Sequence, residues 1–322
     1  MKKVFSIIFC FIIVIPAFQT FVRVFPEIKI EEKRVLATFP KISLSEKTLE
    51  GLTNYFNDNF GLRGSLIFMN NYIDLSVFKI SPNSQVIIGK NGWMYYQPSY
   101  ESNSLVLNQM DVELVSRKIY DFQKKVEADG KKFVFVLAPD KESIYPEFLK
   151  DKLVGLGNYE LITNVLKQNN VNTFDGLKLL QDAKGKGSMV YSKNDTHWTR
   201  YGLFLTINEM FKALGRSAID SSGVEDVQRV GDLSLLVGFN NSETVPQPIV
   251  DNSKVVAKDR VLIFHDSFFD NEMYFTLLFK NFKKIHWATG PIEKEYVDLE
   301  NSYDVVIMEI AERDFIKLGT KL

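Results

Sequence analysis

The hydrophobic pattern is strongest at the N-terminus, where Val4–Phe18 is almost continuously apolar and apolar residues continue patchily to Val22. Two lysines precede this stretch, which is the layout of a secretory signal or a membrane anchor. The stretch is about long enough to cross a bilayer, and the lysines favour a cytoplasmic N-terminus. No small-x-small cleavage site is evident at Ala17-Phe18-Gln19. We therefore expect residues 1–22 to form an uncleaved anchor, with a cleaved signal peptide as the alternative.

Residues 23–100 mix polar and apolar positions and predict a connector, two helices and a hairpin. Helical spacing of apolar residues marks Ser45–Asn59, whose first residue suits an N-cap, and a second helix is expected over Leu62–Phe78. Val86–Tyr96 predicts a hairpin, because Asn91-Gly92 supplies the positive φ values of a tight turn. We expect these parts to pack on one domain that covers the chain from residue 23 to residue 322.

From residue 111 onward, helical and strand patterns alternate. Helices are predicted over Asp111–Asp129, Asn158–Asn169, Arg200–Leu214 and Asn271–Phe282. Strands are predicted over Phe133–Leu137, Val171–Phe174, Val261–Phe264, Lys284–Trp287 and Asp304–Ile310. Residues 221–254, rich in Ser, Asn and Pro, are expected to be irregular. This alternation is typical of an α/β domain with a mostly parallel sheet, in which ligands bind outside the carboxyl ends of the strands.

Charge and cysteine content narrow the function. The 322 residues carry 39 basic and 40 acidic side chains, a net charge of −1, without the basic stripe expected of a nucleic-acid-binding protein. The single cysteine, Cys10, lies in the apolar N-terminal stretch, so neither disulfides nor thiol chemistry is expected in the rest of the chain. With three histidines in all, a multi-histidine metal site is not expected either. We predict neither a metal nor a cofactor.

Two short segments carry the side chains of a nucleophilic triad. Asp195-Thr-His197-Trp198 places a carboxylate two residues before an imidazole, and His265-Asp-Ser267-Phe268 places a hydroxyl just past a predicted strand. A serine hydroxyl becomes a useful nucleophile when a base takes its proton and a third group orients that base. Asp195, His197 and Ser267 therefore predict acyl-group chemistry, with Trp198 and Phe268 as apolar walls. The alternative is that these polar residues cap helices, as Ser267 or Asp266 would for the helix predicted at 271.

Further polar residues follow predicted strands and are candidates for oxyanion or substrate contacts. These candidates are Arg313, Lys141 and Tyr145. Each also has a structural interpretation. Arg313 could form an ion pair with Glu309 or Glu312, Lys141 could be solvated or ion-paired, and Tyr145 could be a buried ring in a turn.

Several motifs occur in a consistent order along the chain. The two central ones are Asp195-Thr-His-Trp-Thr199 with Gly202, and Phe264-His-Asp-Ser-Phe268. The others are Glu32-x-Arg34-x-Leu36-Ala37-x-x-Pro40, Tyr55-Phe-Asn-Asp-Asn-Phe-Gly-Leu-Arg63, Val86–Tyr96, Ala138–Glu147, Gly231-Asp-Leu233 and Val306–Arg313. Together they resemble the alginate O-acetyltransferase family of the AlgJ and AlgX type, which has an SGNH hydrolase-like domain.

This resemblance implies an α/β three-layer sandwich with a mostly parallel sheet in circularly permuted order. It implies Ser267 as nucleophile, His197 as general base and Asp195 as the carboxylate that orients it. The reaction implied is transfer of acetyl through an acetyl-serine to hydroxyls of an exported or cell-envelope polysaccharide. The resemblance also implies a membrane-bound O-acyltransferase as acetyl supplier, and a periplasmic or other extracytoplasmic site anchored to the inner membrane.

Two departures from the family pattern leave alternatives open. His265 stands where the family usually has Gly, so its side chain is expected to crowd the turn or to alter access to Ser267. Competition by His265 as a base is a lesser alternative, because a neighbour two residues away points poorly at the serine Oγ. After the last strand, Glu309, Glu312 and Arg313 occur where ordinary SGNH enzymes use Asn, so Arg313 is a candidate second oxyanion donor beside the Ser267 N–H. A carbohydrate acetylesterase with the same triad and a non-catalytic polysaccharide-modification scaffold remain the rival functions. No carbohydrate-binding module is expected after residue 322.

Overall fold

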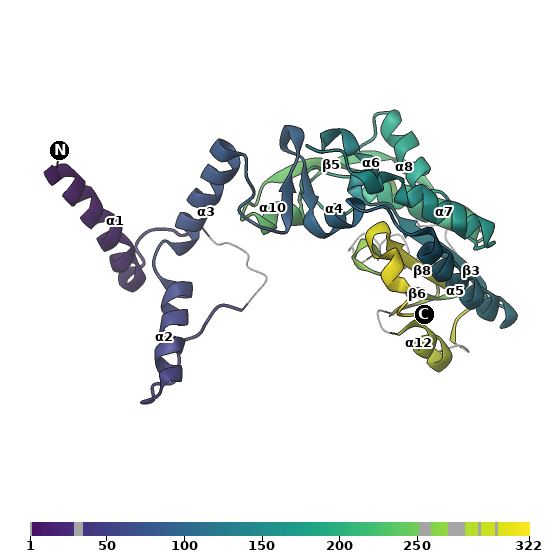
Figure 1. Cartoon of the computed structure of the whole chain (residues 1–322), viewed down its shortest axis with the longest axis horizontal. Helices are drawn as coiled ribbons and strands as arrows, with labels where there is room; N and C mark the ends of the chain where they lie inside the picture. The colour runs from purple at the N-terminus through teal and green to yellow at the C-terminus, as the bar shows by residue number, and fades with distance from the viewer. Residues whose placement is uncertain (1, 29–34, 251–258, 270–280, 289–290, 300–301) are drawn as a thin grey trace. The chain divides into compact units, whose positions relative to one another are not determined.

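The computed structural model describes residues 2–28, 35–250, 259–269, 281–288, 291–299 and 302–322. The chain divides into two compact units (Figure 1). One unit combines residues 1–86 with 234–241, and the other combines 87–233 with 242–322. The segment 23–100, which was expected to pack on one domain, is thus shared between the two units.

The first unit contains α1 (Lys2–Val22), α2 (Glu46–Asn59) and α3 (Arg63–Ile73), which continues as one π-helical turn over Asp74–Phe78. The helices predicted over 45–59 and 62–78 are therefore confirmed. Among the described residues, α1 is the one helix long and apolar enough to cross a membrane, and most of its described side chains are exposed. Its length and composition fit the expected anchor, and they would also fit a signal sequence.

The second unit is built on a four-stranded sheet. Its strands are β3 (Lys132–Ala138), β6 (Arg260–Phe264), β7 (Lys284–Ala288) and β8 (Val305–Ala311). They pair in the order β3-β8-β6-β7, and every pairing is parallel. β3 after its first residue and the whole of β8 are buried, because helices cover the sheet and exclude water from these apolar runs. This confirms the predicted α/β class with a parallel sheet.

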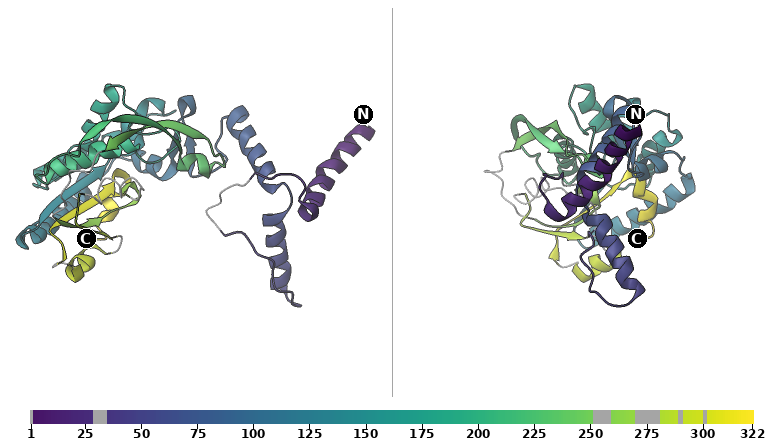
Figure 2. Two further views of the ribbon diagram at one scale, coloured as in Figure 1. Left: turned by 180° about the vertical axis from the view of Figure 1, so that it is seen from behind. Right: turned by 90° about the vertical axis from the view of Figure 1, so that its left-hand side faces the viewer.

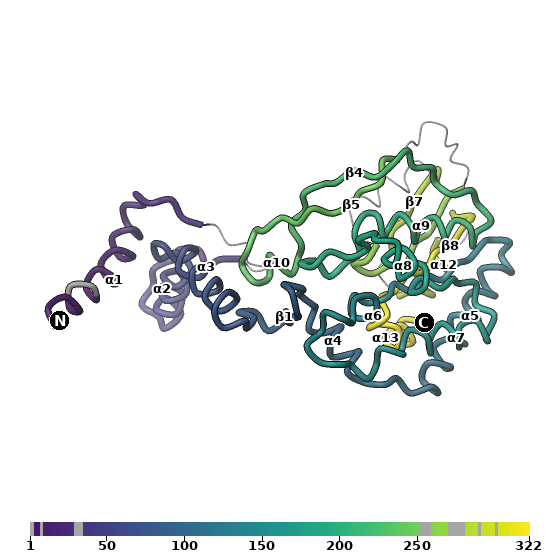
Figure 3. Tube along the Cα trace, turned by 90° about the horizontal axis from the view of Figure 1, so that it is seen from above, coloured from purple at the N-terminus to yellow at the C-terminus, as the bar shows by residue number. Residues whose placement is uncertain are grey.

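Helices lie against the sheet. They are α5 (Gln109–Ala128), α7 (Asn158–Gln168), α8 (Gly176–Gly185), α9 (Arg200–Ala213), α12 (Ile292–Leu299) and α13 (Phe315–Leu318). From α5, Phe122 contacts Phe133 and Phe264 of the sheet and Tyr296 of α12. Figure 3 shows α5, α7 and α13 grouped together, while α9 lies beside α8. Helices on both faces fix the strand ends, and the loops at those ends carry the site.

Two predictions about this unit are wrong. Residues 171–174 form no strand; Thr173 makes a single parallel bridge to Phe135. Residues 221–254, expected to be irregular, contain β4 (Ser221–Val230) and β5 (Ser242–Val250), which form an antiparallel ribbon (Figure 2). The helix α10 (Asp232–Leu236) lies between them in sequence. The ribbon is mostly exposed and β5 contains two prolines, so its sequence lacks the apolar alternation of a half-buried strand.

Shorter elements complete the second unit. The predicted hairpin is present as β1 (Val86–Ile88) and β2 (Met94–Tyr96), with positive φ at Asn91 and Gly92. The short helices α4 (Gln97–Asn103) and α6 (Lys141–Ile144) were not predicted. The helix predicted over 271–282 lies almost entirely outside the described residues, and only its last two positions are described.

Candidate active site

Three polar side chains from two distant loops meet past the carboxyl end of the sheet. Ser267 begins a 3₁₀ turn three residues after β6, while Asp195 and His197 lie in the loop before α9. The Ser267 Oγ is 3.1 Å from the Nε2 of His197, and the Nδ1 of His197 is 3.1 Å from the Oδ1 of Asp195. The structure therefore brings together the three residues singled out from the sequence. This chain of contacts is the geometry in which an imidazole can take a hydroxyl proton.

Aromatic packing ties the histidine loop to the serine turn. Trp198 is buried, and its Nε1–H donates to the carbonyl oxygen of Phe268 at 3.2 Å. The Phe268 ring meets Trp198 edge-on at 5.1 Å and lies 5.0 Å from the His197 ring. Thr199 caps α9 by accepting from the Gly202 N–H, which fixes where the loop ends. Trp198 and Phe268 therefore pack on each other and fix the spacing of base and hydroxyl.

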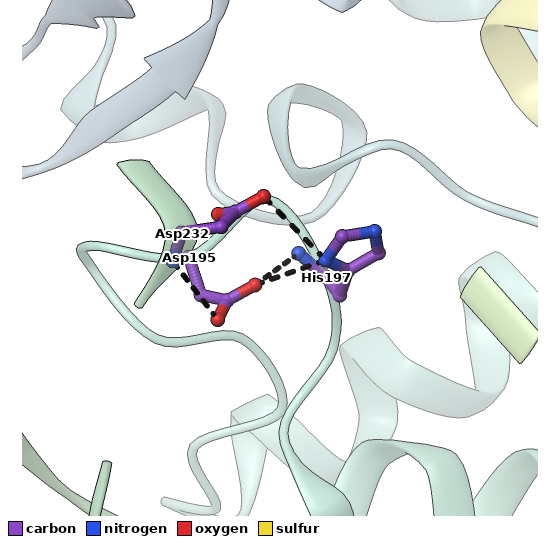
Figure 4. A group of neighbouring side chains, drawn as sticks. All are labelled: Asp195, His197 and Asp232. Atoms are coloured by element: carbon purple, nitrogen blue, oxygen red, sulfur yellow. Dashed lines mark hydrogen bonds and ion pairs between the residues drawn. The ribbon is translucent and has the colours of Figure 1, made fainter. Parts of the chain in front are cut away.

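Asp232 is a second carboxylate at the same imidazole, and sequence reasoning did not single it out. Its Oδ2 is 3.7 Å from the Nδ1 of His197, and its Oδ1 accepts from the Thr196 N–H at 2.7 Å. Figure 4 shows Asp195 and Asp232 reaching the same side of the ring. Gly231 permits this approach, because a Cβ there would lie 2.0 Å from a carbonyl oxygen of the loop before Asp195. The signal for Asp232 was the motif Gly231-Asp-Leu233, which was recognised without a role.

The two carboxylates set the protonation of the imidazole. Burial lowers the pKa of His197, but the hydrogen bond and charge of Asp195 and the charge of Asp232 outweigh it, so this pKa is raised overall. Burial alone would raise the pKa of Asp195. The hydrogen bonds and the charge of His197 lower this pKa by more than burial raises it, so it ends below its ordinary value. Burial and the charge of Asp195 raise the pKa of Asp232. His197 is therefore a stronger base than a solvated imidazole, with Asp195 as its ionised partner.

The serine turn is held by Asp266 and Glu309. The Asp266 carboxylate accepts from the Phe268 N–H at 2.8 Å and from the Ala311 N–H at 2.7 Å. The backbone N–H of Asp266 donates to the Oε2 of Glu309 at 3.1 Å. Burial and the charge of Asp266 raise the pKa of Glu309 well above its ordinary value, which favours the neutral acid. These bonds leave the Ser267 N–H without an acceptor among the described residues, so it can donate to an oxyanion.

Arg313 lies beside this turn with a partner other than those expected. Its Nη1 is 2.5 Å from the Oδ1 of Asp140, so the predicted ion pair with Glu309 or Glu312 is wrong. Both side chains are buried, and Coulombic attraction to Asp140 outweighs the burial that would lower the pKa of Arg313. The guanidinium carbon sits 5.1 Å from the centre of the Phe268 ring, next in sequence to the nucleophile. Arg313 is therefore fixed beside the turn that carries Ser267.

His265 does not compete for the role of base. Its Nδ1 is 2.8 Å from the carbonyl oxygen of Asp266, and its ring packs edge-on against Trp287 at 5.2 Å. Its φ is not positive, so the turn accepts a side chain at this position. The crowding expected from replacing Gly is thus avoided, because the ring turns toward β7.

Lys141 and Tyr145, both candidates for substrate contact, are buried in other roles. The Tyr145 ring packs at a tilt against Trp93, with the ring centres 4.4 Å apart, and its hydroxyl accepts from the Val190 N–H at 3.3 Å. This matches the alternative of a buried ring in a turn. Lys141 donates to main-chain carbonyls of the loop that carries Asp195. Neither side chain is placed as the sequence-based role required.

One group of side chains has the spacing of a metal site. Oxygens of Asp195 and Asp232 and the Nδ1 of His197 all lie within 4.8 Å of one another. The Nδ1 already shares a hydrogen with Asp195, however, and the Nε2 faces a hydroxyl. The arrangement is complete as a hydrogen-bonded base, and we assign no metal to it.

Comparisons with known proteins point to one family. Residues 86–278, more than half of the chain, match the family model described as the SGNH hydrolase-like domain of the acetyltransferase AlgX. A probable alginate O-acetylase AlgJ from Pseudomonas fluorescens is 26% identical over 132 residues, covering 40% of this chain and 33% of that protein. The AlgJ of Pseudomonas syringae pv. tomato is 22% identical over 219 residues, covering 64% and 55%. The chain thus spans about a third to about half of these relatives.

Among solved structures, PatB1 of Bacillus cereus shares the fold. It superposes with a TM-score of 0.53 at 14% identity, covering 71% of this chain and 96% of that protein. An identity this low speaks for the architecture alone. The similarity agrees with the parallel sheet and its helices described above.

Proposed function

This chain belongs to the AlgX family of SGNH hydrolase-like acetyltransferase domains, and we propose that it transfers acetyl groups through Ser267 to hydroxyls of a polysaccharide. The observation that carries the proposal is the continuous contact from Asp195 through His197 to Ser267. An exposed hydroxyl with a basic imidazole at 3.1 Å suits covalent acyl transfer. The names of the relatives support acetyl as the group and a polysaccharide as acceptor.

In the first half-reaction, His197 Nε2 takes the proton of Ser267 as its Oγ attacks the carbonyl carbon of an acetyl donor. The negative charge that develops on the carbonyl oxygen is met by the Ser267 N–H and by the guanidinium of Arg313. When the tetrahedral intermediate collapses, His197 returns the proton to the departing oxygen of the donor. Asp195 stabilises the imidazolium between these steps and holds its tautomer.

In the second half-reaction, a sugar hydroxyl takes the place of the departed donor. His197 removes the proton of this hydroxyl, and the sugar oxygen attacks the acetyl carbon of the acetyl-serine. The bond to Ser267 breaks, and the serine oxygen recovers the proton from His197. Atoms and charges balance without a cofactor, and one imidazole serves both halves.

We place this activity outside the cytoplasm, on a chain held to the inner membrane by α1. Support comes from α1, whose apolar length begins with Lys2 and Lys3. The positive charges of these two lysines favour a cytoplasmic N-terminus. A soluble acetyl donor is not needed if a membrane-bound O-acyltransferase passes acetyl groups across the membrane. We propose such a protein as partner, in keeping with the family resemblance.

The decisive experiment incubates the full-length protein in detergent with para-nitrophenyl acetate and follows two products. Mass spectrometry of peptides containing Ser267 should show one added acetyl group, and added oligosaccharide should shift product from free acetate to acetylated sugar. Ser267→Ala should abolish both, while Ser222→Ala, at an exposed hydroxyl on β4, should change neither.

The two rival functions predict different products. If acetate is released at the same rate with every oligosaccharide and no sugar is acetylated, the protein is an esterase. If Ser267 is never acetylated and Ser267→Ala leaves polymer acetylation in cells unchanged, the protein is a scaffold and the proposed chemistry is wrong.

A further inference from the structure

A buried lysine outside the triad organises the loop that carries Asp195. Lys141 starts the short helix α6 directly after β3, and its side chain is 3% exposed. Its Nζ donates to the carbonyl oxygens of Ser192 at 3.0 Å, Lys193 at 3.2 Å and Asp195 at 2.5 Å. An ammonium has three N–H donors, so each of them is used on this loop.

The loop from 192 to 195 is fixed along its whole length. The carbonyl oxygen of Lys193 also accepts from the Met94 N–H at 2.8 Å, and that of Asn194 accepts from the Leu233 N–H at 3.0 Å. All four consecutive carbonyls therefore have donors, and Lys141 supplies three of the contacts. The same loop delivers the carboxylate that orients His197.

We propose that Lys141 is a positioning residue of the reaction, which holds the main chain of Asp195 so that its carboxylate meets His197 Nδ1. This rests on the proposed acyl transfer, because it assigns a role in acylation of Ser267. Burying a charge is costly unless hydrogen-bond partners surround it, and all three N–H groups of this ammonium donate to the same loop. The rings of Trp93 and Tyr95, 5.7 Å and 5.4 Å from the Nζ, enclose it on other sides.

The charges that face Lys141 come from several elements. Asp195 and Asp232 lie on the site loops, Glu142 on α6 and Glu243 on β5. Burial lowers the pKa of Lys141 to about 8, against the charges of Asp195, Glu142, Asp232 and Glu243, which raise it. Loss of the proton leaves two N–H donors for three carbonyls. The acylation rate should therefore fall as pH rises past this value.

The test compares two lysines whose ammonium groups both lie over aromatic rings, Lys141 over Trp93 and Tyr95 and Lys184 over Tyr145. Lys141→Met removes the three donors, whereas Lys184→Met removes an ammonium that bonds Ile144 and Glu147 and touches no residue of the triad loop. The rate of Ser267 acetylation by para-nitrophenyl acetate is measured from acidic to alkaline pH in the full-length protein. We expect Lys141→Met to lower the plateau by about tenfold to hundredfold. We also expect its acid limb to shift to lower pH, because a displaced Asp195 no longer raises the pKa of His197. Lys184→Met should match the wild type.

A second variant decides the matter if Lys141→Met does not fold. Lys141→Arg keeps a positive charge that does not titrate, so the alkaline fall in rate should disappear while the plateau drops because a planar guanidinium cannot make the same three bonds. An unchanged plateau and acid limb in Lys141→Met would overturn the proposal, as would an alkaline limb in Lys141→Arg at its wild-type position. If Ser267→Ala still forms acetyl-enzyme, the proposed function itself has failed, and that result is separate from either lysine outcome.

Discussion

Asp232→Asn isolates the charge of the second carboxylate from its hydrogen bond. The amide oxygen can still accept from the Thr196 N–H, which now bonds Asp232 at 2.7 Å, so the loop should keep its conformation. What disappears is a negative charge 3.7 Å from the Nδ1 of His197. The variant therefore measures how much this charge contributes to the basicity of the imidazole.

The size of the effect follows from distance and exposure. Two unit charges about 4 Å apart interact by roughly 4 kcal/mol at an effective dielectric constant near 20. The side chains of His197 and Asp232 are 24% and 32% exposed, so water screens part of this interaction. Burial and the neighbouring Asp195 also raise the pKa of Asp232, which reduces its mean charge. We expect about 1 to 2 kcal/mol, which is close to one pKa unit of His197.

The assay is the rate of Ser267 acetylation against pH. The folded pKa of His197 is raised, and its neutral form is the active base, so the rate rises as pH passes this pKa. Asp232→Asn should move this acid limb about one unit toward lower pH and lower the plateau by up to about tenfold, because the imidazolium of the transition state loses a stabilising charge. Asp226→Asn, on exposed β4, should leave the profile unchanged. An Asp232→Asn profile identical to the wild type would refute the reasoning, since the charge would then have no influence on the base.

Three further substitutions test the remaining contacts. Asp195→Asn removes the negative charge that stabilises the imidazolium and lets an amide NH₂ favour the wrong tautomer, so it should slow acetylation of Ser267 by about 10³- to 10⁴-fold, measured in single turnovers with the acetyl ester. Trp198→Phe removes the bond to the Phe268 carbonyl and leaves a gap, so urea denaturation should show a loss of about 1 to 3 kcal/mol. Glu309→Gln should be nearly neutral at low pH and increasingly stabilising as pH rises. The pKa of Glu309 is raised in the folded state. The stability that the protonated Glu309 contributes is therefore fully present below its unfolded-state pKa, and it is lost as pH rises through its folded-state pKa. A stability difference between Glu309→Gln and wild type that does not change with pH would contradict this assignment.

The sheet and the triad were predictable because each depends on a local signal. Continuous apolar runs mark strands covered on both faces, and such strands place whatever follows them at one edge. Ser267 follows one of these runs, so its position at the site required only the strand. The position of His197 could be predicted because the loop that carries it ends at the well-marked helix α9, which Thr199 caps. A hydroxyl, an imidazole and a carboxylate at such places already suggest the chemistry.

The rest of the site depends on pairing between distant segments, which no local pattern reports. Asp232 follows an exposed ribbon strand whose composition predicts a loop, so the motif Gly231-Asp-Leu233 gave no indication that this carboxylate lies beside His197. Glu309 and Glu312 precede Arg313 in sequence, yet its shortest ion pair is with Asp140 from the loop after β3, because parallel strands bring their carboxyl ends together. Lys141 was placed at the correct edge, but whether its ammonium faces a ligand or a main-chain loop is a matter of tertiary packing.

The charges around His197 also limit when the acetyl-serine can be discharged. Asp195 and Asp232 raise the pKa of the imidazole, which makes it a better base but leaves it more often protonated at neutral pH. The positive charge of Lys141, which bonds the Asp195 main chain, offsets part of the negative charge of these carboxylates. Burial lowers the pKa of Lys141 to about 8. We therefore expect acceptor activation to be fastest above the pKa of His197 and below that of Lys141. We expect a rate profile with two limbs. The carboxylates beside His197 set the acid limb, and Lys141, whose buried ammonium holds the main chain of the Asp195 loop, sets the alkaline limb.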